Sequence, residues 1–146
     1  MEIDRLWEDS ELRKKSMKVL FDTSFLMLSA ELGRDLISLA EDAIGEKIEP
    51  YILSDSLEEL KAISRHRGKR ASLAKVALKL AEKMTLIKLD LEEALEVDEK
   101  LLRASRMHGL VLATIDSKLM KKAREIGVPV LSVGRGLKIR LEGIVP

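Results

Sequence analysis

Two aspartates that follow apolar segments have the type and position to form a charged site. Asp22 comes directly after VLF at 19–21, and Asp116 follows the apolar stretch LVLAT at 110–114. An ionised carboxylate is costly to bury without a partner, so each one either caps the next helix or forms one wall of a charged site. Ligands bind beyond the carboxyl ends of strands in open parallel sheets, which favours a ligand site at these positions.

Two further acids, Asp98 and Glu59, lie in segments with helical patterns. The stripe that contains Asp98 repeats at spacings of three and four residues and includes Ala94, Leu101, Leu102 and Ser105. Such a stripe faces the protein interior, so Asp98 needs a cation, a hydrogen-bond partner or a buried ion pair with Lys or Arg. Glu59 either leans toward the sheet or belongs to a capping box at the start of its helix, formed by Asp55 with Glu58 or by Ser56 with Glu59.

Strands alternate with helices along the chain and would position these acids. The patterns predict strands at 18–21, 50–53, 85–89, 110–114, 128–133 and 137–141. They predict helices at 24–32, 34–45, 55–64, 73–84, 92–109 and 117–127. Parallel strands need crossover connections, so the expected fold is a three-layer α/β/α sandwich with a mostly parallel central sheet. Residues 1–16 are expected to form an appended N-terminal helix, and 17–146 to form the domain.

The composition narrows the class of protein. The 146 residues suit one domain, and 26 Lys and Arg against 25 Asp and Glu leave a net charge of +1, so any polyanion site must be a local patch. There is no Cys, which excludes disulfides and thiolate metal sites. The absence of Asn and Gln, with many charged residues, is typical of a thermophile. No apolar run approaches the roughly 20 residues of a membrane span, and the N-terminus is too acidic for a signal peptide, so we expect a cytoplasmic protein and no membrane partner.

Several segments resemble the successive motifs of PIN domains, a family of metal-dependent nucleases. They are VLFDTSFL, SLEEL, VDEKLLRASRMHGLVLATIDSKL and KKAREIGVPVLSV, and the resemblance extends from about Lys18 to Leu141. The most specific part is the pair Asp98 and Asp116, eighteen residues apart, with a helix, a glycine and an apolar strand between them. The ending VPVLSVGRGLKIRLEG is similar to the archaeal branch near the ribosomal RNA-processing PIN proteins.

The resemblance implies that Asp22, Glu59, Asp98 and Asp116 are the catalytic, metal-binding acids of an endoribonuclease. Clustered carboxylates repel one another unless a cation is present, and Mg²⁺ or Mn²⁺ takes oxygen ligands. The expected function is therefore Mg²⁺- or Mn²⁺-dependent hydrolysis of RNA, with ribosomal RNA processing as its setting. The alternatives are a non-catalytic PIN-like module that binds RNA or protein in ribosome assembly, and a toxin-type PIN ribonuclease. The resemblance also admits a homodimer, and a ribosome-assembly or antitoxin partner.

Small hydroxyl residues and a basic turn are the candidates for binding RNA. Thr23, Ser24 and Thr114 either orient ligands and phosphate oxygens or serve as simple helix caps. The run SRHRGKR presents Arg65, Arg67, Lys69 and Arg70, which either contact the RNA backbone or form a solvated turn. Ser24 stands where the family often has Asn. Lys118 stands where many members have another acid, which predicts weak or single-metal occupancy unless Lys118 itself binds phosphate.

Overall fold

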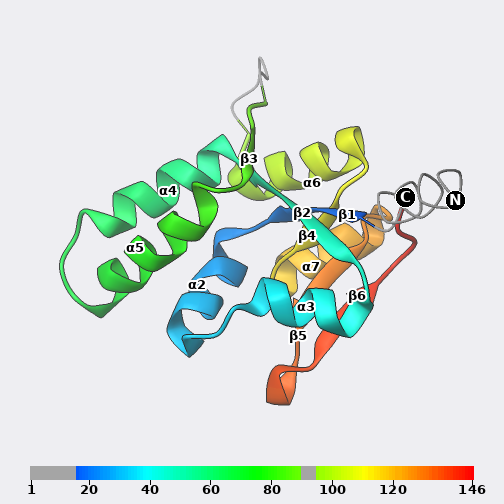
Figure 1. Cartoon of the computed structure of the whole chain (residues 1–146). Helices are drawn as coiled ribbons and strands as arrows, with labels where there is room; N and C mark the ends of the chain where they lie inside the picture. The colour runs from blue at the N-terminus through cyan, green and yellow to red at the C-terminus, as the bar shows by residue number, and fades with distance from the viewer. Residues whose placement is uncertain (1–15, 90–94) are drawn as a thin grey trace, which may run out of the picture.

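A six-stranded sheet forms the centre of the molecule in the computed structural model, which describes residues 16–89 and 95–146 (Figure 1). The strands are β1 Ser16–Phe21, β2 Lys47–Leu53, β3 Thr85–Ile87, β4 Val111–Ala113, β5 Val130–Val133 and β6 Ile139–Glu142. Their order is β3-β2-β1-β4-β5-β6, and all neighbours are parallel except β5 and β6. The order reverses between β1 and β4, the topological switch point at which such sheets bind ligands.

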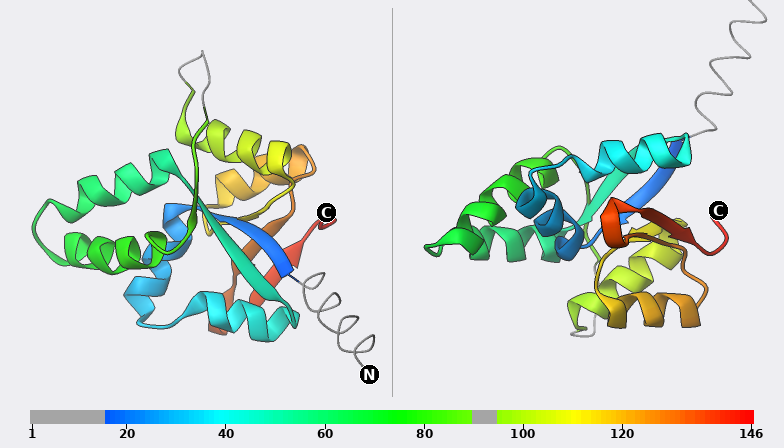
Figure 2. Two further views of the ribbon diagram at one scale, coloured as in Figure 1. Left: turned by 45° about the horizontal axis from the view of Figure 1, so that its top comes forward. Right: turned by 90° about the horizontal axis from the view of Figure 1, so that it is seen from below.

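Helices cover both faces of this sheet, so the three-layer α/β/α fold is confirmed. They are α2 Thr23–Leu32, α3 Leu36–Ile44, α4 Ser54–Ser64, α5 Lys69–Ala81, α6 Val97–His108 and α7 Ser117–Glu125, with a short turn of 3₁₀ helix, η1, at Arg135–Leu137. Seen from below, α2 and α3 lie on one side of the sheet and α6 and α7 on the other (Figure 2). None of the helices within the described ranges is long and apolar enough to cross a membrane.

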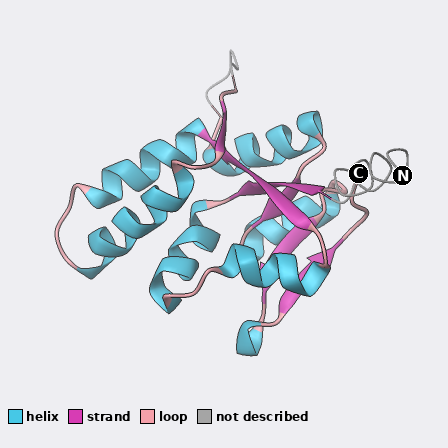
Figure 3. Ribbon diagram, in the orientation of Figure 1, coloured by secondary structure: helices cyan, strands magenta, loops and turns pink. Residues whose placement is uncertain are grey.

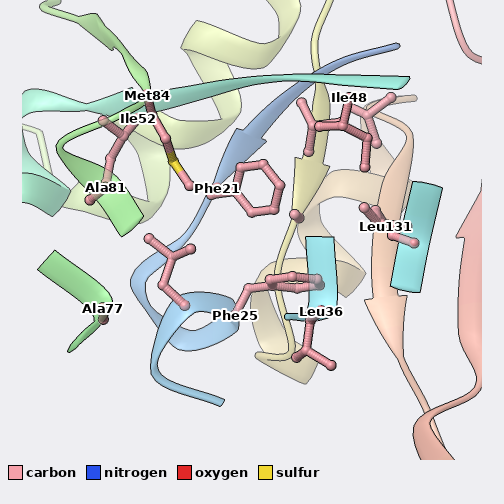
Figure 4. Close-up of a cluster of buried hydrophobic side chains, with 14 of the residues drawn as sticks. Phe21, Phe25, Leu36, Ile48, Ile52, Ala77, Ala81, Met84 and Leu131 are labelled. Carbon is pink, nitrogen blue, oxygen red and sulfur yellow. The ribbon is translucent and has the colours of Figure 1, made fainter. Parts of the chain in front are cut away.

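Side chains that alternate along the strands build a separate core on each face. Val19 and Phe21 of β1 pack toward α2 and α3, whereas Leu20 between them packs toward α6 and α7. Phe25 of α2 meets Phe21 edge to face, with ring centroids 5.3 Å apart, and both rings are fully buried (Figure 4). The start of α2, directly after Asp22, is thereby fixed against the sheet.

The helices α4 and α5 form an arm that projects to one side of the sheet (Figures 1 and 2). The face that α5 turns inward consists of small residues, Ala71, Ala74, Ala77 and Ala81, and all four are buried. Small side chains allow α5 to approach α2 and α4 closely, and α5 contacts both. The basic turn that joins α4 to α5 therefore lies at the outer end of a packed arm, away from the sheet (Figure 1).

Most expected elements are present, with differences at their ends (Figure 3). Gly33 and Gly45 end α2 and α3 in the left-handed conformation, as their positions in the sequence predict. Among the described residues, the helix expected over 92–109 begins at Val97, because Leu95 is not helical and Glu96 is extended; residues 92–94 lie outside the described ranges. The helix expected from Leu73 begins at Lys69 instead, so part of the supposed basic turn is helical. The expected appended helix lies outside the described residues, apart from Ser16, which already belongs to β1.

The Phe21–Phe25 contact should be essential for the stability of the end of the sheet where Asp22 lies. We expect Phe25→Ala to lower the free energy of unfolding by about 3–5 kcal/mol, because it leaves a cavity between α2 and β1. Leu32→Ala, on the same helix but 41% exposed, should cost much less. Urea denaturation of the two variants measures both values, and equal losses would contradict a dominant role for Phe25.

Candidate functional site

The four acids line one cavity, of about 530 Å³, at the carboxyl ends of the central strands. Asp22 follows β1, Glu59 lies in the middle of α4, Asp98 is in the first turn of α6, and Asp116 directly precedes α7. Thr23 and Ser24 line the same cavity. The structure therefore brings together, from four separate segments, the acids that the resemblance to PIN domains singles out.

Pairing between β1 and β4 places Asp22 beside the end of β4. The residues Phe21 and Ala113 are partners in the sheet, and the amide of Asp22 donates to the carbonyl oxygen of Ala113 at 2.9 Å. Asp22 is only 8% exposed. Its backbone has the extended conformation of a helix N-cap, but its side chain makes no cap hydrogen bond, so the carboxylate is left for other partners.

Two hydroxyl groups hold the Asp22 carboxylate in place. Ser24 Oγ donates to Asp22 Oδ2 at 2.7 Å, and Thr114 Oγ1 donates to the same oxygen at 2.8 Å. Thr114 Oγ1 also accepts from the amide of Asp116 at 3.1 Å. Thr114 is fully buried, so a substrate-contacting role does not fit it. Its hydroxyl instead ties Asp22 to the backbone of Asp116 and stabilises both acids from behind the cavity.

Glu59 and Asp98 are electrostatically strained. Partial desolvation of the carboxyl at the cavity raises the pKa of Glu59, although the residue as a whole is exposed, and the nearby negative charge of Asp22 raises it further. A long 3.5 Å hydrogen bond from Thr23 and the charge of Arg70 act in the opposite direction. Burial also raises the pKa of Asp98, as do the charges of Asp116 and Asp22. Both raised pKa values indicate that the surrounding protein does not fully offset the negative charges of the acids when they are ionised.

The sequence also allowed purely structural roles for Asp116, for Asp98 and for the acids at the start of α4, and the structure contains only the first of these among the residues that it describes. Asp116 does cap α7, because its Oδ1 accepts from the amides of Lys118 at 2.9 Å and Leu119 at 3.4 Å. No described Lys or Arg forms an ion pair with Asp98, so the buried-pair explanation is wrong for the described part of the chain. Neither expected capping box forms on α4, which begins at Ser54 without a side-chain cap. Asp116 thus caps α7 and also lines the cavity.

The donor set of the cavity suits a hard divalent cation. It offers carboxylate and hydroxyl oxygens, the ligands that Mg²⁺ and Mn²⁺ prefer, and it contains carboxylates whose charge the protein leaves uncompensated. No three Asp, Glu or His side chains of the described residues are arranged as a ready-made metal site, however. The acids therefore share a cavity without being preassembled around one point.

The basic residues divide into one that lines the cavity and others that do not. Arg70, in the first turn of α5, is part of the cavity wall. Arg65, Arg67 and Lys69 are exposed and lie outside that wall. Lys118 is likewise exposed and outside it, so it does not block the cavity. The sequence did not reveal Lys122, one turn further along α7, whose charge lowers the pKa of Asp98.

Comparisons with known proteins agree with this geometry. The sequence model of the family described as "PIN like domain" matches residues 19–136, and this chain belongs to that family. A solved structure titled "Structure of the PIN domain endonuclease Utp24" matches with a TM-score of 0.69 and 27% sequence identity, over 88% of this chain and 92% of that chain. Ribonuclease VapC9 of Archaeoglobus fulgidus is 38% identical over 64 residues, which are 44% of each protein. The chain thus matches less than half of that relative's length, while the expected membership of the PIN family is confirmed.

Removal of one charge from the cluster should not weaken the fold. At neutral pH Asp98 is ionised against a raised pKa, and this costs stability, so Asp98→Asn should leave the free energy of unfolding unchanged or raise it by up to about 1 kcal/mol. Asp55→Asn is the matched control, because it removes the 2.7 Å ion pair with Lys100 and should lower stability by a similar amount. Urea denaturation in the presence of a chelator measures both, and a clear loss in Asp98→Asn would indicate a structural role.

Proposed function

We propose that this protein is an endoribonuclease that depends on a divalent metal ion, Mg²⁺ or Mn²⁺. The observation that carries the proposal is the convergence of Asp22, Glu59, Asp98 and Asp116 on one cavity at the topological switch point. The names of two relatives support the reaction class, since one is a ribonuclease and the other an endonuclease. The resemblance of the C-terminal segment to the ribosomal RNA-processing branch supports structured ribosomal RNA as the substrate.

The chain itself would contribute positioning and charge. Asp22, Glu59, Asp98 and Asp116 would hold the ion, and a bound ion would supply Lewis acidity toward water and the scissile phosphodiester. Ser24 and Thr114 keep one oxygen of Asp22 occupied, which leaves the other oxygen free of them. Thr23 and Ser24 present hydroxyls at the cavity wall, within the region where a phosphate oxygen would lie. Histidine is absent from the described residues that line the cavity, so the acids are the groups available there to accept a proton.

A neighbouring pair of glutamates on α4 gives a sharp test of this proposal. Glu59→Gln should reduce cleavage of a structured RNA in Mn²⁺ by more than about 100-fold, because a metal ligand is lost. Glu58→Gln should keep nearly full activity, since Glu58 lies outside the cavity of the acids and makes only a surface ion pair with Lys61 at 3.4 Å. Gel-based cleavage assays with and without chelator measure both effects. Purified wild-type protein that binds RNA but cleaves none in Mn²⁺ would instead favour the non-catalytic module.

The basic residues of the arm supply the attraction for RNA. No Asp or Glu stands between Glu59 and Glu82, whereas Arg65, Arg67, Lys69, Arg70, Lys75 and Lys79 all fall in that interval. None of the ion pairs among the described residues involves any of these six. A concentrated positive surface beside an acidic cavity can bind the flanking backbone of an RNA whose scissile phosphate lies at the acids.

Loss of these charges should change the salt dependence of RNA binding. The double variant Arg67→Ala/Lys69→Ala should flatten the slope of log affinity against log salt by about 0.7 for each phosphate contact that is lost. The control Lys138→Ala/Arg140→Ala removes two exposed cations, one directly before β6 and one within it, at the far edge of the sheet, and should keep the wild-type slope. Fluorescence anisotropy with a labelled RNA at several salt concentrations measures the slopes. If the two double variants behave alike, the basic turn does not bind RNA.

A further inference from the structure

The cavity that contains the acids also has an apolar side. Met27 of α2 and Ile63 of α4 line it together with Arg70 of α5. These three residues come from the helical arm and its neighbour α2, whereas Asp98 and Asp116 come from α6 and the start of α7, in the layer on the other face of the sheet. Val97 of α6 adds an apolar residue on that side too, so each side of the cavity has an apolar part.

Helical spacing explains how the apolar side extends outward from the acids. Met27 follows Thr23 by four residues on α2, and Ile63 follows Glu59 by four residues on α4, so each lies one turn beyond a polar residue of the site. Both helices begin at the sheet and run away from it (Figure 1). Moving outward from the acids, the wall changes from carboxylate and hydroxyl groups to thioether and aliphatic groups, with Arg70 beside them.

Met27 and Ile63 are only half-buried, so they keep apolar surface that a ligand can cover. Apolar side chains next to a few polar groups are the usual composition of a small-molecule site. Arg70 is exposed and forms no ion pair with any described residue, although it lines the cavity that holds Glu59. A guanidinium in this position can bind a phosphate group through two parallel hydrogen bonds.

We propose that Met27, Ile63 and Arg70 form a subsite for one nucleotide of the RNA strand, next to the phosphate that lies at the acids. The base packs on Met27 and Ile63, and Arg70 binds the adjoining phosphate. This inference rests on the proposed function, because the acids then define where the strand lies. Ile63 has no hydrogen-bonding side-chain group and the Met27 sulfur is only a weak acceptor, so the subsite recognises the presence of a base rather than its identity.

Abasic scanning of a single-stranded RNA tests the base contact directly. The protein carries Asp98→Asn, which should prevent cleavage and lies outside the subsite, and binding is followed by fluorescence anisotropy in Mg²⁺. We expect an abasic nucleotide at one position to weaken binding about fivefold. Adding Met27→Gln should abolish that penalty, whereas adding Met107→Gln, on an exposed residue of α6, should preserve it. Met27→Leu, which restores an apolar surface, should also preserve it.

The phosphate contact is tested with a second pair of variants in the same background. Arg70→Gln should weaken binding of intact and abasic RNA by the same factor, and by more than Lys79→Gln does, because Lys79 lies on the same helix outside the cavity. The subsite is refuted if no position shows an abasic penalty, if Met27→Gln leaves the penalty intact, or if Arg70→Gln and Lys79→Gln have equal effects.

Failure of the subsite can be distinguished from failure of the proposed function. If wild-type protein cleaves RNA while the abasic penalty is absent, the function stands and the subsite is wrong. If wild-type protein cleaves no RNA but the penalty is present and depends on Met27, the subsite stands and the nuclease function is wrong. Thermal unfolding of each variant shows whether a change in binding reflects the fold, and Met27→Leu provides the test if Met27→Gln unfolds.

Discussion

The parallel pairing of β1 with β4 is the constraint on which the candidate site depends. The sheet order reverses at this pair, so no crossover helix covers the space beyond their carboxyl ends. The hydrogen bond from the Asp22 amide to the Ala113 carbonyl continues the pairing one residue past β1. It brings Asp22 beside Thr114 and, through the Thr114 hydroxyl, beside the backbone of Asp116. Loss of this register would separate two of the four acids.

The cluster illustrates how a fold tolerates a local electrostatic cost. Asp22 is nearly buried, and it is compensated by hydroxyl hydrogen bonds from Ser24 and Thr114 rather than by an ion pair with a described cation. Glu59 and Asp98 have less support, and their raised pKa values reflect burial and mutual repulsion. The rest of the structure offsets this cost through two well-packed cores, one on each face of the sheet.

The two helical layers contribute different chemistry to one cavity. The layer of α6 and α7 supplies Asp98, Asp116 and the apolar Val97, and the layer of α2, α4 and α5 supplies Glu59, a larger apolar wall and Arg70. The alanine face of α5 matters here, because close packing against α2 and α4 brings the first turn of α5, and with it Arg70, to the cavity. The proposed division into a reacting side and a nucleotide-holding side follows from this arrangement.

Local sequence patterns determined the strands, the glycine-terminated helices, the mostly parallel sheet and the positions of Asp22 and Asp116 at strand ends. These features follow from periodicity and from turn chemistry, which act over a few residues. Only the tertiary structure decided that Arg70 alone of the basic run lines the cavity, that Thr114 is buried behind the acids, and that Met27 and Ile63 share their cavity. The direction of a side chain toward a site depends on how its helix packs against segments far away in the chain, and no local pattern contains that information.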